Sequence, residues 1–143
     1  MQPKVAAAAI LVVAALQAVS VCAERPAWIT QEILDMIAND KNNCMAEHGT
    51  TEAQVDSVNN GQLPEDRSIT CYMFCMFDTF AVVDEDGVLD ADTLSSFFPE
   101  EVQEKARGAF GPCSEPPGDD NCDKMKNLAK CIHEHDPSML FMI

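Results

Sequence analysis

Basic side chains are scarce in this sequence, and the motifs of common enzymes are missing. Nine lysine and arginine residues stand against 24 aspartate and glutamate residues, which gives a formal net charge of -15 at pH 7. A surface this acidic repels phosphate backbones and anionic membranes, which argues strongly against nucleic-acid binding. Neither Gly-x-Ser-x-Gly nor His-Glu-x-x-His occurs, so the chain lacks a nucleophile elbow and a zinc-protease motif. We expect neither an enzyme nor a cofactor.

Long hydrophobic runs are confined to the beginning of the chain. Residues 5–16 are apolar throughout, but this stretch is shorter than the roughly 20 residues that a membrane-spanning helix needs. Val21 and Ala23 stand where the small residues of a signal-peptide cleavage site are expected. The sequence therefore predicts a secretory signal peptide over residues 1–23, a single helical domain over residues 24–143 and no membrane insertion.

Unpaired cysteines are not expected in the mature chain. Cleavage after Ala23 removes Cys22, one of seven cysteines, and leaves six at positions 44, 71, 75, 113, 122 and 131. An even number in an oxidising compartment indicates disulfides. Cys71 and Cys75 lie one turn apart on one predicted helix with side chains not aimed at each other, so each should reach a different helix. The spacing alone leaves the pairing open.

Apolar residues recur at helical spacing along most of the chain, which predicts an all-α fold. Capping and turn residues divide the chain into predicted helices over residues 30–48, 51–59, 68–83, 90–98, 99–110 and 120–135. The segment 68–83 is apolar nearly all round, which is typical of a central, buried helix. Its cysteines share one face, and Met73, Met76, Phe77 and Phe80 occupy the opposite face.

Two possible metal sites fail on geometry. The sequence "DEDGVLDAD" at residues 84–92 looks like part of a calcium loop, but in the EF-hand register positions five, six and twelve would be valine, leucine and serine. A turn followed by a capped helix is the simpler interpretation. His133 and His135 point about 200° apart on one helix and cannot hold the same ion. We expect no metal.

The cysteine spacing and two motifs carry a family resemblance. The motifs are "CYMFC" followed by "VVDEDG", and "NCDKMKNLAKC" followed by "DP". With the signal peptide and the single-domain length, they closely resemble the insect odorant-binding proteins, which include the general-odorant and pheromone-binding proteins. The resemblance implies disulfides Cys44–Cys75, Cys71–Cys122 and Cys113–Cys131 that hold a bundle of six helices around an apolar pocket.

The resemblance also implies a function and a location. The expected protein is a secreted carrier that binds small hydrophobic, odorant-like or pheromone-like molecules reversibly and carries them through aqueous sensillar lymph. An odorant receptor is a candidate partner, and both a monomer and a homodimer remain open. The alternatives are a secreted calcium-binding module, which the failed register disfavours, and an interaction protein whose Met and Phe side chains fill a solid core.

Helical phase places a set of apolar side chains where they would line such a pocket. Tyr72, Thr79 and Ser95 are also candidate hydrogen-bonding partners for a ligand. The predicted wall residues are Tyr72, Met73, Met76, Phe77, Phe80, Leu94, Phe97, Phe98, Phe110, Leu128, Ile132 and Phe141.

The segment "SMLFMI" at residues 138–143 is unusually apolar for a chain end. Two interpretations remain open, since this tail either docks on the core or closes a ligand cavity. The neighbouring "HEHDP" suggests a pH switch. If ionised carboxylates, including that of Ile143, hold the tail, closure should be intact at neutral pH and lost as they protonate. Equal affinity for a reporter dye at about pH 7 and about pH 5 would count against this switch.

Overall fold

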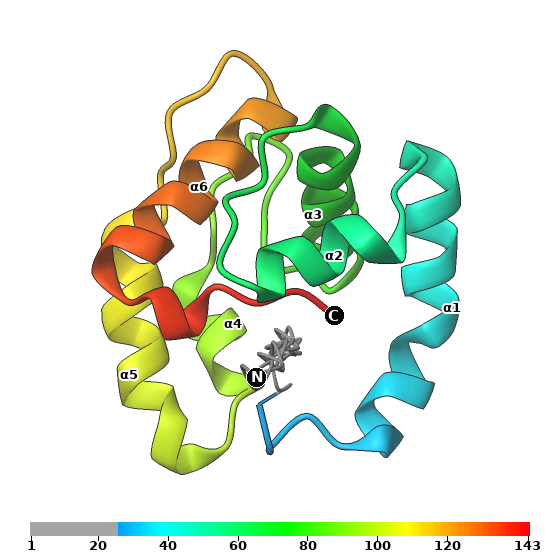
Figure 1. Ribbon diagram of the computed structural model, residues 1–143. Coiled ribbons are helices and arrows are strands. Elements are labelled where there is room, and N and C mark those ends of the chain that lie inside the picture. The colour runs from blue at the N-terminus through cyan, green and yellow to red at the C-terminus, as the bar shows by residue number, and fades with distance from the viewer. Residues whose placement is uncertain (1–25) are drawn as a thin grey trace, which may run out of the picture.

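The computed structural model describes residues 26–143, which fold into helices joined by short loops (Figure 1). No strand forms within this range, where Val83 and Leu89 make an isolated bridge. The all-α class that the sequence predicts is confirmed. The elements are α1 (Gln31–His48), α2 (Glu52–Asn59), α3 (Arg67–Thr79), α4 (Ala91–Ser96), α5 (Glu100–Phe110), η1 (Gly111–Cys113), α6 (Asn121–His135) and η2 (Pro137–Met139), of which η1 and η2 are short 3₁₀ helices.

Helix α3 is central, because it packs against both α1 and α6. Figure 1 shows α1 at one edge of the molecule, α5 and α6 toward the other, and the C-terminal segment passing between α2 and α4 in this view. The apolar character of α3 is thereby explained, since both of its sides meet other helices. Its buried residues are Ile69, Thr70, Tyr72, Met73 and Met76.

The predicted signal peptide, residues 1–23, lies outside the described residues, so its removal stays a prediction. Within residues 26–143, no helix combines the length and the apolar character that crossing a bilayer requires.

Side-chain caps fix where several helices begin. The predicted capping box of α2 is confirmed, since Thr51 accepts the N–H of Gln54 and the Gln54 side chain accepts the N–H of Thr51. Asp90 caps α4 and Asp120 caps α6, each by accepting the N–H three residues further on. The hydroxyl and then the N–H of Thr93 lower the pKa of Asp90. This cap is therefore ionised at neutral pH.

The central helix ends earlier than the sequence predicts. Helix α3 stops at Thr79 instead of residue 83, because the chain turns at Ala81 with a φ of 53°. The Val82 N–H donates 3.0 Å to the carbonyl five residues back, and the Ala81 N–H donates 2.9 Å to the Asp78 carbonyl. This is the hydrogen-bond pattern of a Schellman cap. Val82 and Val83 then continue as buried, non-helical chain, which suits β-branched side chains.

Replacing Ala81 with glycine is expected to raise the free energy of unfolding by about 0.5–1 kcal/mol, because glycine adopts a positive φ without the steric cost of a Cβ atom. Urea denaturation followed by circular dichroism measures the change. Ala46→Gly is the matched control, since Ala46 is exposed inside α1 and the same substitution there should cost about 1 kcal/mol. Destabilisation by both variants would contradict the left-handed cap.

The short helix α4 also ends before its predicted limit. It stops at Ser96, so that Phe97 and Phe98 follow the helix instead of belonging to it. Pro99 accounts for the difference, because a proline disfavours helical geometry in the residue before it. The other predicted helices are present.

Three disulfides fasten these helices together. Cys44–Cys75 joins α1 to α3, Cys71–Cys122 joins α3 to α6, and Cys113–Cys131 joins η1 to α6, with Cα–Cα distances of 5.7, 4.6 and 5.7 Å. This is the pairing that the family resemblance implies. Both neighbours of the central helix are thus covalently bound to it, on the face opposite Met73, Met76 and Phe77.

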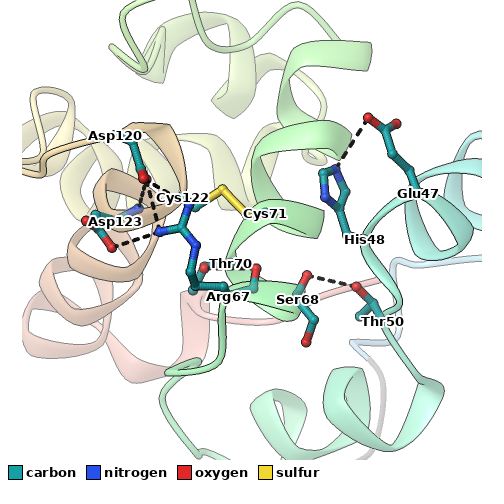
Figure 2. The surroundings of a disulfide bond; sticks show 10 residues. All are labelled: Glu47, His48, Thr50, Arg67, Ser68, Thr70, Cys71, Asp120, Cys122 and Asp123. Carbon is teal, nitrogen blue, oxygen red and sulfur yellow. Dashed lines mark hydrogen bonds and ion pairs between the residues drawn. A yellow bond between two sulfur atoms is a disulfide. The ribbon is translucent and has the colours of Figure 1, made fainter.

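An exposed ion pair lies beside the Cys71–Cys122 bond. Figure 2 shows Arg67, the first residue of α3, reaching Asp120 and Asp123 at the start of α6. The guanidinium lies 2.9 Å from the Asp120 carboxylate and 3.5 Å from that of Asp123. The Asp123 N–H and then Arg67 lower the pKa of Asp120. Because all three side chains are exposed, this pair orients the two helix ends and adds little stability.

Candidate ligand-binding site

A cavity of about 380 Å³ lies between α1, α3, the turn after α4 and the C-terminal segment. Its wall is formed by aliphatic, aromatic and methionine side chains. A volume of this size suits a small organic molecule. The wall residues are Trp28, Ile33, Met36, Ile37, Tyr72, Met73, Met76, Phe77, Phe80, Val82, Leu94, Phe97, Phe98, Phe110, Ile132, Met139, Leu140, Phe141, Met142 and Ile143.

Eleven of the twelve residues predicted from helical phase are on this wall. The face of α3 opposite its cysteines supplies the largest share, as expected from a period of 3.6 residues. Contact of these side chains with a ligand stays a prediction. The eleven are Tyr72, Met73, Met76, Phe77, Phe80, Leu94, Phe97, Phe98, Phe110, Ile132 and Phe141.

Leu128 and two of the predicted hydrogen-bonding residues lie elsewhere. Leu128 is fully buried in the core, and Ile132, one turn further along α6, reaches the wall instead. Helical phase predicts which face of a helix a residue occupies, but not whether that part of the helix reaches the cavity. The exposed Thr79 donates its hydroxyl to the Cys75 carbonyl at 2.8 Å. Ser95 is buried away from the wall, and its Oγ has no hydrogen-bond partner among the described residues.

Sequence reasoning missed nine of the wall residues, and all nine lie outside α3. Ile33 and Ile37 lie one turn apart on the predicted helix over residues 30–48, so a periodic signal for them was present. Trp28 precedes that helix, where no periodic pattern assigns a face. Met139, Leu140, Met142 and Ile143 are apolar tail residues whose position depends on tertiary contacts.

An aromatic cluster forms one part of the wall. The Trp28 ring lies 4.7 Å from that of Phe98 and 5.2 Å from that of Phe141, between ring centroids. Phe98 in turn lies 5.7 Å from Phe110. These spacings are within the range of favourable aromatic pairs. The cluster joins the segment before α1, the turn after α4, the end of α5 and the C-terminal tail.

The C-terminal tail both docks on the core and forms part of the wall, so the two interpretations hold together. Met139, Leu140 and Met142 are buried and line the cavity. Asn59, the last residue of α2, donates from Nδ2 to the Met142 carbonyl at 2.9 Å and accepts the Met142 N–H at Oδ1 at 2.7 Å. This pair of hydrogen bonds fixes the tail over the cavity.

Tyr72 adds a second attachment for the tail. Its hydroxyl donates to the main-chain oxygen of Ile143 at 2.5 Å, and its side chain is fully buried. Burial, and then the charge of Glu52, raise the pKa of Tyr72. The hydroxyl therefore stays protonated and remains a donor at any physiological pH.

Replacing Asn59 with aspartate is expected to loosen the tail, because a charged oxygen then faces the Met142 carbonyl in place of the amide donor. A cost of about 1–3 kcal/mol makes opening about 5- to 150-fold more frequent. Hydrogen exchange of the Met142 amide, followed by NMR, measures the opening. Asn43→Asp adds the same charge at an exposed position of α1 and should leave this exchange unchanged. Equal exchange in the two variants would show that Asn59 does not hold the tail.

Met36 and Phe97 mark the entrance of the cavity. Both line it, yet 73% of Met36 and 57% of Phe97 remain exposed. They come from α1 and from the residue that ends α4. A ligand would therefore enter between these two elements.

Two groups of potential metal ligands occur in the described part of the chain, and neither suits a metal. The first is Cys113, Cys131 and His135, and the second is Glu47, His48 and Cys75. Their sulfur atoms belong to disulfides, so they offer no thiolate. Each group retains too few ligands for a structural zinc site.

Comparison with known proteins gives consistent results. The model of the PBP/GOBP family matches residues 26–135. The chain is 30% identical over 104 residues to general odorant-binding protein 69a of Drosophila melanogaster, covering 72% of this chain and 70% of that relative.

Comparison with solved structures also finds odorant-binding proteins. Odorant binding protein 7 of Anopheles gambiae, in complex with an azo compound, is similar with a TM-score of 0.66 and 26% identity, over 80% of this chain and 99% of that one. The fatty acid binding protein OBP56a of the blowfly Phormia regina shares the fold, with a TM-score of 0.60 and 18% identity over 77% and 96% of the two chains.

Proposed function

The chain belongs to the PBP/GOBP family of odorant-binding proteins, and on this premise we propose that it is a carrier of small hydrophobic molecules. It is secreted after removal of residues 1–23, binds an odorant-like or pheromone-like ligand reversibly in the cavity, and moves it through aqueous lymph. Binding of a small organic molecule by the mosquito relative supports this reading. Contact with an odorant receptor and the choice between monomer and homodimer stay predictions.

The observation that carries the proposal is the cavity itself. An unfilled apolar volume costs about 24 cal/mol per Å³. A cavity of about 380 Å³ therefore lowers the stability of the fold by several kcal/mol unless something occupies it. A solid-core protein would close such a space. An apolar ligand would regain the lost contacts, with affinity of about 25 cal/mol per Å² of surface buried before ordering costs.

The disulfides explain how the empty form can persist. Each typically contributes about 2–4 kcal/mol, mainly by restricting the unfolded chain. Two of them join α3 to α1 and α6 on the side away from the cavity, so they stabilise the helices without filling the space between them. The five methionines on the wall suit ligands of varied shape, because their side chains are flexible and polarizable.

Displacement of a neutral fluorescent probe tests the carrier function. N-phenyl-1-naphthylamine should bind the disulfide-intact protein saturably, and alcohols, aldehydes and esters of medium chain length should displace it. Failure of the probe and of all these compounds to bind would refute the proposal. A response of melting temperature to calcium against chelator would instead favour the calcium-binding alternative.

We also propose acid-dependent release, with Asp136 as its sensor. Asp136 accepts the N–H of Ser138 at 3.0 Å and the Ser138 hydroxyl at 2.6 Å, in the turn that leads into the tail. Lys105 of α5 lies 3.4 Å from the same carboxylate. The Ser138 hydroxyl, its N–H and Lys105 lower the pKa of Asp136. The stabilisation is therefore present above the unfolded pKa of about 3.9 and is lost as the pH falls through the lowered value.

Ligand affinity is accordingly expected to stay constant from about pH 7 to about pH 5 and to fall below about pH 4. This onset is lower than that of the switch suggested by "HEHDP", so equal affinity at about pH 7 and about pH 5 would count against that switch and not against Asp136 as the sensor. Asp136→Asn should weaken binding already at neutral pH, whereas Asp119→Asn in the exposed loop before α6 should behave like the unmodified protein. Circular dichroism at each pH confirms that the helices persist. A loss between about pH 7 and about pH 5 that survives in Asp136→Asn would assign the switch to other groups.

A further inference from the structure

We propose that the cavity selects uncharged ligands over carboxylates of the same chain length. This inference rests on the proposed carrier function and narrows its ligand class. It follows from an apolar wall without a counter-ion and an entrance flanked by acidic side chains.

The wall offers almost nothing to a charged headgroup. Among residues 26–143, no lysine, arginine, histidine, aspartate or glutamate lines the cavity. The wall side chains carry two polar groups, the Tyr72 hydroxyl and the Trp28 indole N–H. The hydroxyl already donates to Ile143. A ligand oxygen must therefore compete with the tail for this donor, and it finds no positive charge.

Three cations on α1 and α5, which both contribute wall residues, pair with acidic side chains instead. Lys41 lies 2.9 Å from Glu52, Lys105 lies 3.4 Å from Asp136, and the Arg107 guanidinium lies 3.3 Å from Asp92. None of these three cations is a wall residue. To reach a bound carboxylate, each would have to leave its acidic partner.

The entrance repels anions as well. Around the exposed Met36, the helix surface carries Glu32 and Asp40, four residues before and after it, and Asp35 is its sequence neighbour. Residues 31–40 contain no lysine or arginine. A ligand carboxylate held at this entrance, with its alkyl chain inside, therefore meets charges of its own sign.

An ionised carboxylate without a partner is strongly disfavoured in an apolar cavity, so a fatty acid should enter as the neutral acid. The apparent affinity then depends on the protonated fraction of the free acid. Above the acid's pKa of about 4–5, this fraction falls about tenfold for each pH unit. An ester of the same chain has no such dependence.

The test compares decanoic acid with methyl decanoate as competitors for N-phenyl-1-naphthylamine, at intervals from about pH 5 to about pH 8. This range lies above the region in which Asp136 titrates. The apparent affinity of the acid is expected to fall about tenfold per pH unit, while that of the ester changes less than about twofold. An acid that competes as well as the ester at about pH 8 would overturn the inference and leave the carrier function intact. An ester that fails to bind at every pH would overturn both.

A pair of entrance variants tests the role of charge. Phe97 is 57% exposed, so Phe97→Lys should fold, and Phe97→Gln removes the same ring without adding a charge. The lysine variant is expected to bind decanoate at about pH 8 at least about tenfold more tightly than the glutamine variant, with equal affinities for the ester. Equal binding of decanoate by both variants would show that missing positive charge is not what excludes the acid.

Discussion

Replacing Cys71 and Cys122 together with serine is expected to lower the free energy of unfolding by about 4 kcal/mol. The bond closes a loop between residues separated by 51 positions, and the entropy that a crosslink removes from the unfolded chain grows with loop length. Both cysteines are half-buried, so serine fits without a large cavity. The bond also joins α3 to α6, whose packing supports one side of the ligand cavity.

Denaturation in guanidinium chloride measures this loss, and two controls separate its causes. Arg67→Gln removes the neighbouring ion pair with Asp120 and should cost less than about 1 kcal/mol. Serine at both Cys113 and Cys131, which are separated by 18 positions, should cost about 3 kcal/mol by the same loop-length argument. A Cys71 and Cys122 variant as stable as the unmodified protein would show that covalent bracing does not offset the cavity.

Replacing Met76 with tryptophan is expected to weaken binding of N-phenyl-1-naphthylamine by at least about 100-fold, equivalent to about 2.8 kcal/mol. Met76 lies on the cavity wall in the last turn of α3 and is buried. A larger ring at this position occupies space that the ligand needs. Because the ring enters an existing cavity, the stability should change by less than the roughly 1–3 kcal/mol that overpacking of a filled core costs.

Leu63→Trp provides the matched control for this substitution. Leu63 is partly exposed and does not line the cavity, so the same ring there should leave probe affinity unchanged. Loss of probe binding in both variants would point to a general disturbance of the fold. Unchanged affinity in Met76→Trp would mean that the probe binds elsewhere on the protein.

The wall residues of α3 could be predicted because helical phase alone determines them. A helix fastened on one face by Cys71 and Cys75 must present Met73, Met76 and Phe77 on the other. Helical phase also places Ile132 on the wall but includes Leu128 as well, since phase does not tell how far along a helix the cavity extends. Periodicity therefore identifies which face of a helix meets the cavity, and tertiary packing decides which residues along that face reach the wall.

Other features were beyond the reach of local pattern. No glycine marks the left-handed turn at Ala81 in the sequence, so the predicted central helix extended to residue 83. Trp28 belongs to no helix, and its place beside Phe98 and Phe141 depends on how the segment before α1 meets the turn after α4 and the C-terminal tail. The attachment of Met142 to Asn59 spans most of the sequence. Contacts between distant segments leave no signal in a local pattern.

The disulfide pairing shows a different limit. Side-chain direction made bonds within one helix unfavourable, but several pairings between helices remained. Only the resemblance to a family selected Cys44–Cys75, Cys71–Cys122 and Cys113–Cys131, the pairing that the structure contains. Spacing restricts which crosslinks are possible, whereas the fold determines which cysteines meet.

Quenching of Trp28 fluorescence by a brominated ester tests the central claim most directly, namely that an unfilled apolar cavity takes up an uncharged ligand. Trp28 is the single tryptophan of the chain and lies on the cavity wall, and a bromine atom quenches an indole only in close contact. Saturable quenching that methyl decanoate reverses is the expected result. Quenching no stronger than that of free tryptophan at the same ester concentration would contradict it.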